Sequence, residues 1–141
     1  MTKSIKNICI ITGSRADYDL LQPIIRGLSK IKKFKVKTIV TGSHFVKYQT
    51  SIDIIKKDRI KIFKKIKIPY KNDSNSTILK SISSGIEKFD QIFKNNKFDL
   101  LIVLGDRYEI FSAVISASFY RIPIAHLSGG EVTEGAIDES L

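Results

Sequence analysis

Cysteine is almost absent from this sequence, with Cys9 the only one among 141 residues. A single thiol cannot form a disulfide within the chain, and Cys9 lies inside an apolar run, so we expect it to be buried. No apolar run approaches the ~20 residues that a membrane-spanning helix needs. The first residues include two lysines but no apolar stretch that ends at a cleavage site. We therefore predict no signal peptide, no membrane partner and a cytoplasmic location.

Motifs for common cofactors are also missing. The turn at residues 13–17 has one glycine where a dinucleotide fingerprint has three, which disfavours NAD. The His, Cys and Asp residues lack the spacing typical of a metal site, and no serine lies on a nucleophile elbow. We therefore expect neither a cofactor nor a metal.

Acidic residues are few, since 14 Asp and Glu stand against 24 Lys and Arg, for a net charge of +10. The lysines are dispersed and alternate with isoleucine, while arginines are scarce and no aromatic ladder accompanies them. This pattern favours a solvated lysine-rich face over a nucleic-acid footprint. We expect no nucleic-acid partner, although salt-sensitive binding to a duplex would reopen the question.

The composition that remains is that of a soluble globular protein, with 43% hydrophobic and 27% charged residues. A chain of 141 residues fits one ordinary domain, and no linker or repeat divides it. Apolar patterning predicts strands and helices in alternation, with residues 59–68 exposed on one face as in an edge strand, and with Asp19 as the cap of the first helix. The strands are expected at residues 7–12, 34–40, 59–68, 100–104 and 123–127, and the helices at 20–31, 45–57, 77–95 and 109–120.

This order predicts an α/β fold, a Rossmann-like parallel sheet with right-handed crossovers and helices on both faces. Loops that follow the strands then meet at one edge, next to helix N-termini that favour phosphate. Two arginines at such an edge suit an anionic ligand, most simply a diphosphate. The candidate binding residues in these loops are Arg15, Asp17, His44, Arg107, Ser128, Gly129 and Gly130.

Several candidate residues also have a purely structural interpretation. Asp106 can be a general acid or base beside a cation, or it can cap a helix or pair with Arg107. Glu131 and Asp138 belong to an acidic cluster in which Asp138 or Glu139 can cap a helix. His44 can be structural, and His126, inside a predicted strand, is expected to be a hydrogen-bonded core residue.

Three motifs together resemble one family, in the same order and spacing. They are Thr12-Gly-Ser-Arg-Ala-Asp-Tyr18, Gly105-Asp-Arg107, and His126-Leu-Ser-Gly-Gly-Glu131 with Gly135-Ala-Ile-Asp-Glu139. They look like the hydrolysing UDP-N-acetylglucosamine 2-epimerases of sialic and legionaminic acid synthesis. The resemblance implies the N-terminal half of a two-domain GT-B fold. We expect residues 1–141 to form this half, with the nucleotide-binding C-terminal domain absent.

The resemblance also assigns roles. Asp106 and Asp138 match acidic catalytic positions, and Arg15 matches a residue at the diphosphate. Some relatives have a catalytic glutamate where this chain has Ser128, and Glu131 is the candidate to take part of that role. The implied substrate is a UDP-2-acetamido sugar, either UDP-N-acetylglucosamine or a 4-acetamido-6-deoxy derivative, and the full-length enzyme is expected to be a homo-oligomer.

Two alternatives stay open at this point. The chain can be the acceptor half of a GT-B glycosyltransferase, a fold relative that rarely needs the three carboxylates at positions 106, 131 and 138. It can also be a non-catalytic nucleotide- or partner-binding module. Under every one of these interpretations, we expect residues 1–141 alone to be inactive or nearly so. A cleft open to water lacks the opposing groups that catalysis requires.

Overall fold

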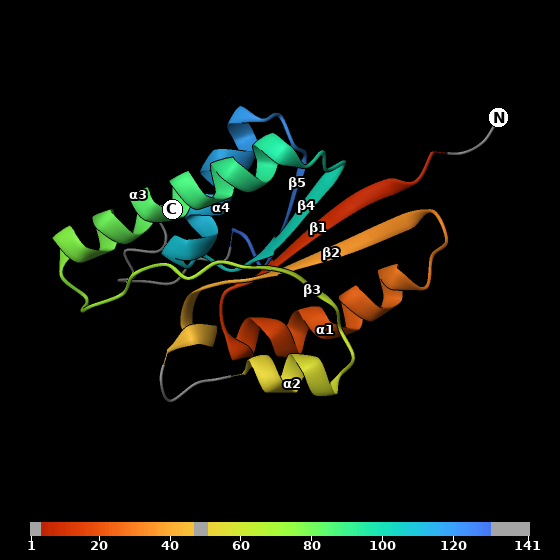
Figure 1. The fold of residues 1–141 in the computed structure, drawn as a ribbon, viewed down its shortest axis with the longest axis horizontal. Helices are drawn as coiled ribbons and strands as arrows, with labels where there is room; N and C mark the ends of the chain where they lie inside the picture. Colours follow the sequence, from red (N-terminus) through yellow and green to blue (C-terminus); the bar gives the residue numbers. More distant parts are fainter. Residues whose placement is uncertain (1–3, 47–50, 131–141) are drawn as a thin grey trace.

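The centre of the molecule is a five-stranded parallel sheet, shown in the computed structural model of Figure 1, which describes residues 4–46 and 51–130. The strand order is β3-β2-β1-β4-β5, and every neighbouring pair is parallel. The elements are β1 (Lys6–Thr12), α1 (Arg15–Ser29), β2 (Phe34–Val40), the 3-10 helix η1 (Gly42–Phe45), α2 (Ile52–Lys57), β3 (Ile62–Lys65), α3 (Asn75–Asn95), β4 (Leu100–Leu104), α4 (Tyr108–Phe119) and β5 (Ile124–Leu127). The α/β, Rossmann-like prediction is confirmed.

Helices cover both faces of the sheet, with α1 and α2 on one side and α3 and α4 on the other (Figure 1). Alternate residues of β1 supply the two cores because successive side chains of a strand point to opposite faces. Ile8 and Ile10 pack with Leu21 of α1, whereas Cys9 and Ile11 pack with α3 and α4. Each face of the sheet therefore has its own apolar layer, as expected for central strands of near-continuous hydrophobicity.

Cys9 is fully buried in the layer under α3 and α4, as predicted. Burial raises the pKa of its thiol well above the ordinary value, and the smaller opposing effect comes from the charge of Lys37. The thiol is therefore held in its protonated, unreactive form.

The first helix begins earlier than its apolar pattern indicates. Asp19 was expected as the cap, but α1 begins at Arg15 and Ser14 is its N-cap, with the Ser14 hydroxyl accepting from the Asp17 N–H at 3.2 Å. The prediction of Asp19 as the cap is wrong, because Ser14, six residues before the first predicted apolar position at Leu20, already accepts from one of the orphan N–H groups.

The region after β2 also differs from its prediction of one helix over residues 45–57. The described part contains two short elements, η1 and α2, on either side of residues 47–50. Strand β3 is shorter than the predicted 59–68, although its position at the edge of the sheet is confirmed. No helix within residues 4–46 and 51–130 combines the length and apolarity that a bilayer crossing would require.

Helices α3 and α4 approach closely because small residues meet between them. A Cβ added to Gly85 of α3 would lie 2.6 Å from Oγ and 2.7 Å from Cβ of Ser112 on α4. The Ser112 hydroxyl donates to the Tyr108 and Ile82 carbonyls at 2.9 and 3.2 Å, so it is bonded within α4 and across to α3. Space at Gly85 is therefore needed for the helices to pack.

We expect Gly85→Ala to destabilise the fold by roughly 1–3 kcal/mol through overpacking, although alanine is ordinarily the better helix former by about 1 kcal/mol. The matched control is Gly27→Ala on α1, where an added Cβ meets nothing within 4 Å and should stabilise. Urea unfolding followed by far-UV circular dichroism measures the free energy of unfolding of both variants. Equal effects of the two substitutions would contradict the close-packing argument.

Candidate functional site

The candidate site lies at the carboxyl edge of the sheet, where the chain changes direction between β1 and β4. The connection after β1 leads to α1 on one face, and the connection after β4 leads to α4 on the other (Figure 1). Diverging connections leave a crevice between neighbouring strands, and ligands of open α/β sheets bind at such switch points. Four of the predicted site residues lie here: the binding candidates Arg15 and Asp17 in the first turn of α1, and the binding candidate Arg107 and the catalytic candidate Asp106 between β4 and α4.

A cleft of about 1180 Å³ opens at this edge. It draws its walls from the connections after β1, β2 and β4 and from the segment that precedes α3. Its lining includes Ser14, Arg15, Gly42, Ser43, Tyr70, Asp73, Arg107, Tyr108 and Glu109. Two of the sequence-predicted residues, Arg15 and Arg107, are thus brought to one cavity from parts of the chain more than 90 positions apart.

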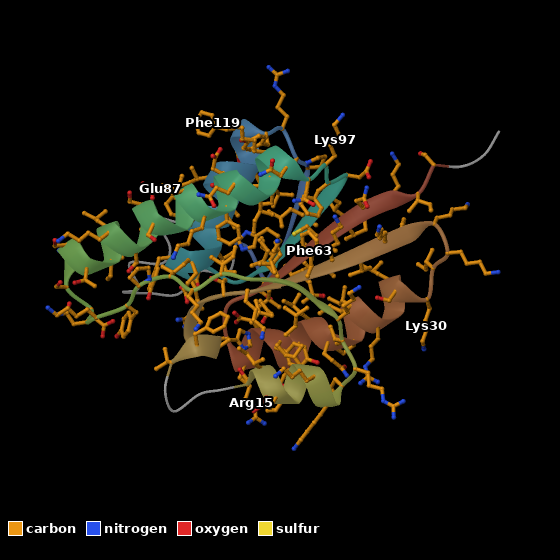
Figure 2. All side chains as sticks on the ribbon, in the orientation of Figure 1. Arg15, Lys30, Phe63, Glu87, Lys97 and Phe119 are labelled. Atoms are coloured by element: carbon orange, nitrogen blue, oxygen red, sulfur yellow. The ribbon has the colours of Figure 1, made fainter. Side chains whose placement is uncertain are left out.

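Arg15 occupies the first turn of α1, where free backbone N–H groups favour an anion. Its side chain is 63% exposed and points away from the sheet in Figure 2. The nearest carboxylate is Asp19, at 3.8 Å across one helical turn, and an exposed pair of this kind contributes at most about 1 kcal/mol. Arg15 is therefore available to a ligand.

Asp17 supports the same connection from inside. The residue is 8% exposed, and its Oδ2 accepts from the Gly13 N–H at 3.2 Å. Its carboxylate also adds to the negative field around Arg107. In this structure Asp17 shapes the β1–α1 connection and faces a guanidinium, a position that limits its access to a ligand.

Arg107 is anchored by a carboxylate that lies almost wholly inside the protein. Its Nε donates to Oε1 of Glu109 at 3.0 Å, and its Nη2 lies 3.0 Å from the same oxygen in an ion pair; the Glu109 side chain is 1% exposed whereas that of Arg107 is 40% exposed. Burial tends to lower the pKa of Arg107, but the charge and hydrogen bonds of Glu109 outweigh it, so this pKa is raised. The guanidinium is therefore a permanent cation at the cleft.

The connection after β2 fits closely around this pair. Gly42 has φ +63°, and a Cβ there would lie 2.2 Å from Oε1 of Glu109 and 2.5 Å from the Gly13 carbonyl oxygen. Ser43 donates to that same carbonyl from its backbone N–H at 2.8 Å and from its hydroxyl at 3.2 Å. Only glycine meets both requirements at position 42, so this residue lets three connections converge.

His44, predicted to contact a ligand, lies beneath the cleft instead. The residue is fully buried, and its Nε2 and Nδ1 are hydrogen-bonded to the hydroxyls of Thr12, at 2.8 Å, and Ser51. Burial, with a smaller contribution from the charge of Arg107, lowers the pKa of His44 to about 4. The ring is neutral at pH 7 and ties β1 to the segment before α2, so the geometry gives it a supporting position.

This buried ring predicts a pH-dependent stability. The pKa of His44 is about 4 in the folded protein and about 6.5 when unfolded, so the unfolded chain binds more protons between these values. Stability is then complete above pH 6.5 and falls as the pH drops towards 4, with about 2 kcal/mol lost between pH 7 and 5. Urea midpoints measured across this range test the loss. His44→Gln should flatten the profile, and an unchanged slope in this variant would exclude His44 as the cause.

Asp106 is exposed just beyond β4 and does not line the described cleft. Neither of its proposed structural roles is observed. Arg107, without a side-chain cap bond, holds the N-cap position of α4, and its ion pair is made with Glu109. Within the described part of the chain, Asp106 is therefore left accessible for chemistry beside a cation.

The end of β5 lies next to Asp106. His126 is hydrogen-bonded as predicted, with Nε2 2.7 Å from the Gly105 carbonyl oxygen, but it is exposed, so its expected place in the core is wrong. The physical reason is that β5 is the edge strand beside β4 and its burial is only partial. Ser128, Gly129 and Gly130 follow at the surface, outside the cleft lining.

Two of the predicted catalytic residues, Glu131 and Asp138, lie outside the described residues. The proposed capping role of Asp138 or Glu139 falls in the same segment. Among residues 4–46 and 51–130, no group of three or more His, Cys, Asp or Glu side chains is arranged to hold a metal ion.

Tyr108 and Glu109 are among the cleft residues that sequence reasoning missed. Burial and the neighbouring carboxylate of Glu109 raise the pKa of Tyr108 to about 12, so its hydroxyl remains a hydrogen-bond donor at neutral pH. Their only signal was position, since they directly follow the Gly-Asp-Arg motif at the start of a helix. Nothing in the sequence shows that Glu109 is buried.

Comparison with known proteins points to one family. The model of the family described as UDP-N-acetylglucosamine 2-epimerase matches residues 26–141. The polysialic acid biosynthesis protein P7 of Escherichia coli is 39% identical over 95% of this chain and 34% of its own length. The GDP/UDP-N,N'-diacetylbacillosamine 2-epimerase (hydrolyzing) of Campylobacter jejuni is 36% identical over 96% of this chain and 35% of its length. The chain thus spans about a third of these relatives.

Solved structures share the fold. A UDP-GlcNAc 2-epimerase from Neisseria meningitidis, crystallised with UDP-GlcNAc, superposes with a TM-score of 0.78 at 22% identity, and the match covers 92% of this chain and 33% of that one. A second UDP-N-acetylglucosamine 2-epimerase gives a TM-score of 0.79 at the same identity, over 94% and 34% of the two chains. In both pairs the likeness extends over nearly the whole of the present chain.

Proposed function

This chain belongs to the UDP-N-acetylglucosamine 2-epimerase family, and we propose that it is the N-terminal part of a hydrolysing 2-epimerase acting on a UDP-2-acetamido sugar. The observation that carries the proposal is the pair of guanidinium groups, Arg15 and Arg107, that line one switch-point cleft, with Asp106, the sequence neighbour of Arg107, exposed at the same edge of the sheet. Arginines match phosphate oxygens in a forked geometry. A carboxylate next to them can exchange a proton with the attached sugar.

In the proposed reaction, a carboxylate removes the C2 proton while the C1–O bond to UDP breaks with its electron pair, which gives a glycal. Water then adds its hydroxyl at C1, and an acid delivers a proton to the opposite face of C2. The products are UDP and the free 2-epimeric sugar. Asp106, Glu131 and Asp138 are the proposed proton-transfer groups, while Arg15 and Arg107 stabilise the departing diphosphate.

The sugar can be UDP-N-acetylglucosamine or its 4-acetamido-6-deoxy derivative. Relatives named for diacetylbacillosamine are 36% and 33% identical to this chain, compared with 23% for the Neisseria meningitidis UDP-N-acetylglucosamine 2-epimerase, which supports the derivative. We further propose that the full-length enzyme is a cytoplasmic homo-oligomer. Sedimentation of the full-length protein tests its assembly.

Turnover of the full-length protein in heavy water tests the proposed reaction. Either sugar nucleotide is supplied, UDP release is followed by chromatography, and the sugar is examined by proton NMR. We expect UDP together with one deuterium at C2 of the epimerised sugar, since that proton comes from solvent. UDP release without C2 labelling would contradict the mechanism and favour a glycosyltransferase or a simple hydrolase.

A further inference from the structure

We propose that Glu109 is a positioning residue, which holds the Arg107 guanidinium in the orientation that receives the diphosphate of the nucleotide sugar. The inference rests on the proposed function for the identity of the ligand. Its basis in the structure is a buried carboxylate that bonds Arg107 through one oxygen only.

The contact between the two side chains determines which part of the guanidinium remains free. Nε of Arg107 donates to the single oxygen Oε1 of Glu109 at 3.0 Å, and Nη2 lies 3.0 Å from the same oxygen. A guanidinium has five N–H donors in one plane, so at least three remain. With Glu109 1% exposed and the Arg107 side chain 40% exposed, the pair reaches from the interior to the cleft surface. The remaining donors are then available at the cleft.

Glu109 is itself held in place by its surroundings. It lies in the first turn of α4, where the helix dipole favours a negative charge, and Gly42 leaves room for its Oε1. A buried carboxylate without a cation would be strongly unfavourable, so its pairing with Arg107 is compulsory. The ion pair therefore fixes the orientation of the half-exposed Arg107 side chain, which would otherwise be flexible.

The second oxygen of Glu109 indicates that the pair is more than a structural ion pair. Oε2 is buried, and within the described part of the chain it has no hydrogen-bond partner. An unsatisfied buried acceptor is unfavourable for folding. Such groups are few in native structures, and a role in the function of the site is one of the explanations for them. Although Glu109 borders the cleft, this atom has almost no accessible surface, so we infer that Glu109 acts through Arg107 without contacting the ligand itself.

The pairing also keeps Arg107 away from its sequence neighbour. Asp106 is adjacent and exposed, and without Glu109 the guanidinium would have Asp106 as an alternative partner. By engaging Nε and Nη2, Glu109 leaves the Asp106 carboxylate accessible. One buried acid therefore serves both the anion site and the proposed proton-transfer group.

A double-mutant cycle on UDP affinity, measured by titration calorimetry with the full-length protein, tests the inference. We expect Arg107→Ala to weaken UDP binding about 30-fold and Glu109→Gln about tenfold, because charge-assisted contacts are lost or misdirected. In the Arg107→Ala background, Glu109→Gln should have less than about twofold further effect. A merely structural role would instead weaken binding equally in both backgrounds.

Controls separate the possible outcomes. Asp58→Asn removes another charge that pairs with an arginine, Arg26 at 3.3 Å, and should leave UDP affinity unchanged. If Glu109→Gln fails to fold, Glu109→Asp keeps the charge but withdraws it from Arg107, and should weaken binding only when Arg107 is present. Wild-type affinity in Glu109→Gln, or effects that multiply, would overturn the positioning role. Absence of UDP binding by the wild-type protein would instead defeat the proposed function itself.

Discussion

Asp106→Asn in the full-length protein should lower kcat by roughly 10²–10⁴-fold, the usual contribution of a positioned general acid or base. The amide cannot accept the C2 proton, whereas the exposed position of Asp106 beside Arg107 means that the exchange leaves no buried group without a partner. UDP affinity should change far less than kcat, because the guanidinium groups that bind the diphosphate are retained. Initial rates of UDP release, together with titration of UDP, measure the two effects separately.

Asp99→Asn is the matched control for this prediction. Asp99 precedes β4 as Asp106 follows it, so the same substitution is made at the opposite edge of the sheet. Its carboxylate accepts from the Asn7 N–H at 2.8 Å and pairs with Lys6 at 3.0 Å. The backbone hydrogen bond from Asn7, followed by Lys6, lowers the pKa of Asp99. We expect normal turnover in this variant. Intact turnover in Asp106→Asn would favour the acceptor half of a glycosyltransferase.

A second large loss of activity is expected when residues 1–141 are separated from the rest of the protein. Residues 1–141, expressed alone, should release UDP from a UDP-2-acetamido sugar at least about a thousandfold more slowly than the full-length enzyme. The chain spans about a third of its relatives, and Asp106 is exposed to water at its edge of the sheet. Water at the reacting carboxylate weakens the electrostatic contacts that a closed site strengthens.

A coupled assay for UDP release checks this prediction, with circular dichroism to establish that the fragment is folded. Mixing it with a separately expressed remainder of the enzyme should restore part of the rate, since the cleft would be closed again. Turnover by residues 1–141 within tenfold of the full-length rate would show that this part carries the whole reaction.

The fold was predictable because its central strands are unusually apolar. The strand Leu100–Leu104 was predicted with the same bounds, and the parallel sheet that alternating strands and helices predict is the observed one. The errors arose where tertiary contacts decide local structure. At Gly42, where η1 begins, the carboxylate of Glu109 and the Gly13 carbonyl leave no room for a side chain. The periodicity of the sequence does not reveal these contacts.

The candidate site was predicted in part, for a similar reason. Residues that follow strand ends could be placed at one edge of the sheet, and Arg15 and Arg107 do line one cleft. The burial of individual polar side chains could not be predicted from the sequence in the same way. His44 and Asp17 are polar residues in predicted loops, yet both lie inside, and Glu109 is buried although it is a charged residue in the first turn of α4. Interior polar groups depend on partners distant in the sequence, which a single chain does not reveal.

The buried thiol of Cys9 makes residues 1–141 a convenient background for site-specific labelling. Because this cysteine is inaccessible and protonated, maleimide reagents should leave the folded chain unmodified. A cysteine introduced at Phe119, which is 86% exposed and projects from the end of α4 in Figure 2, would then be the single reactive handle. A fluorophore attached there could report on the surroundings of this helix end in residues 1–141 without prior replacement of Cys9.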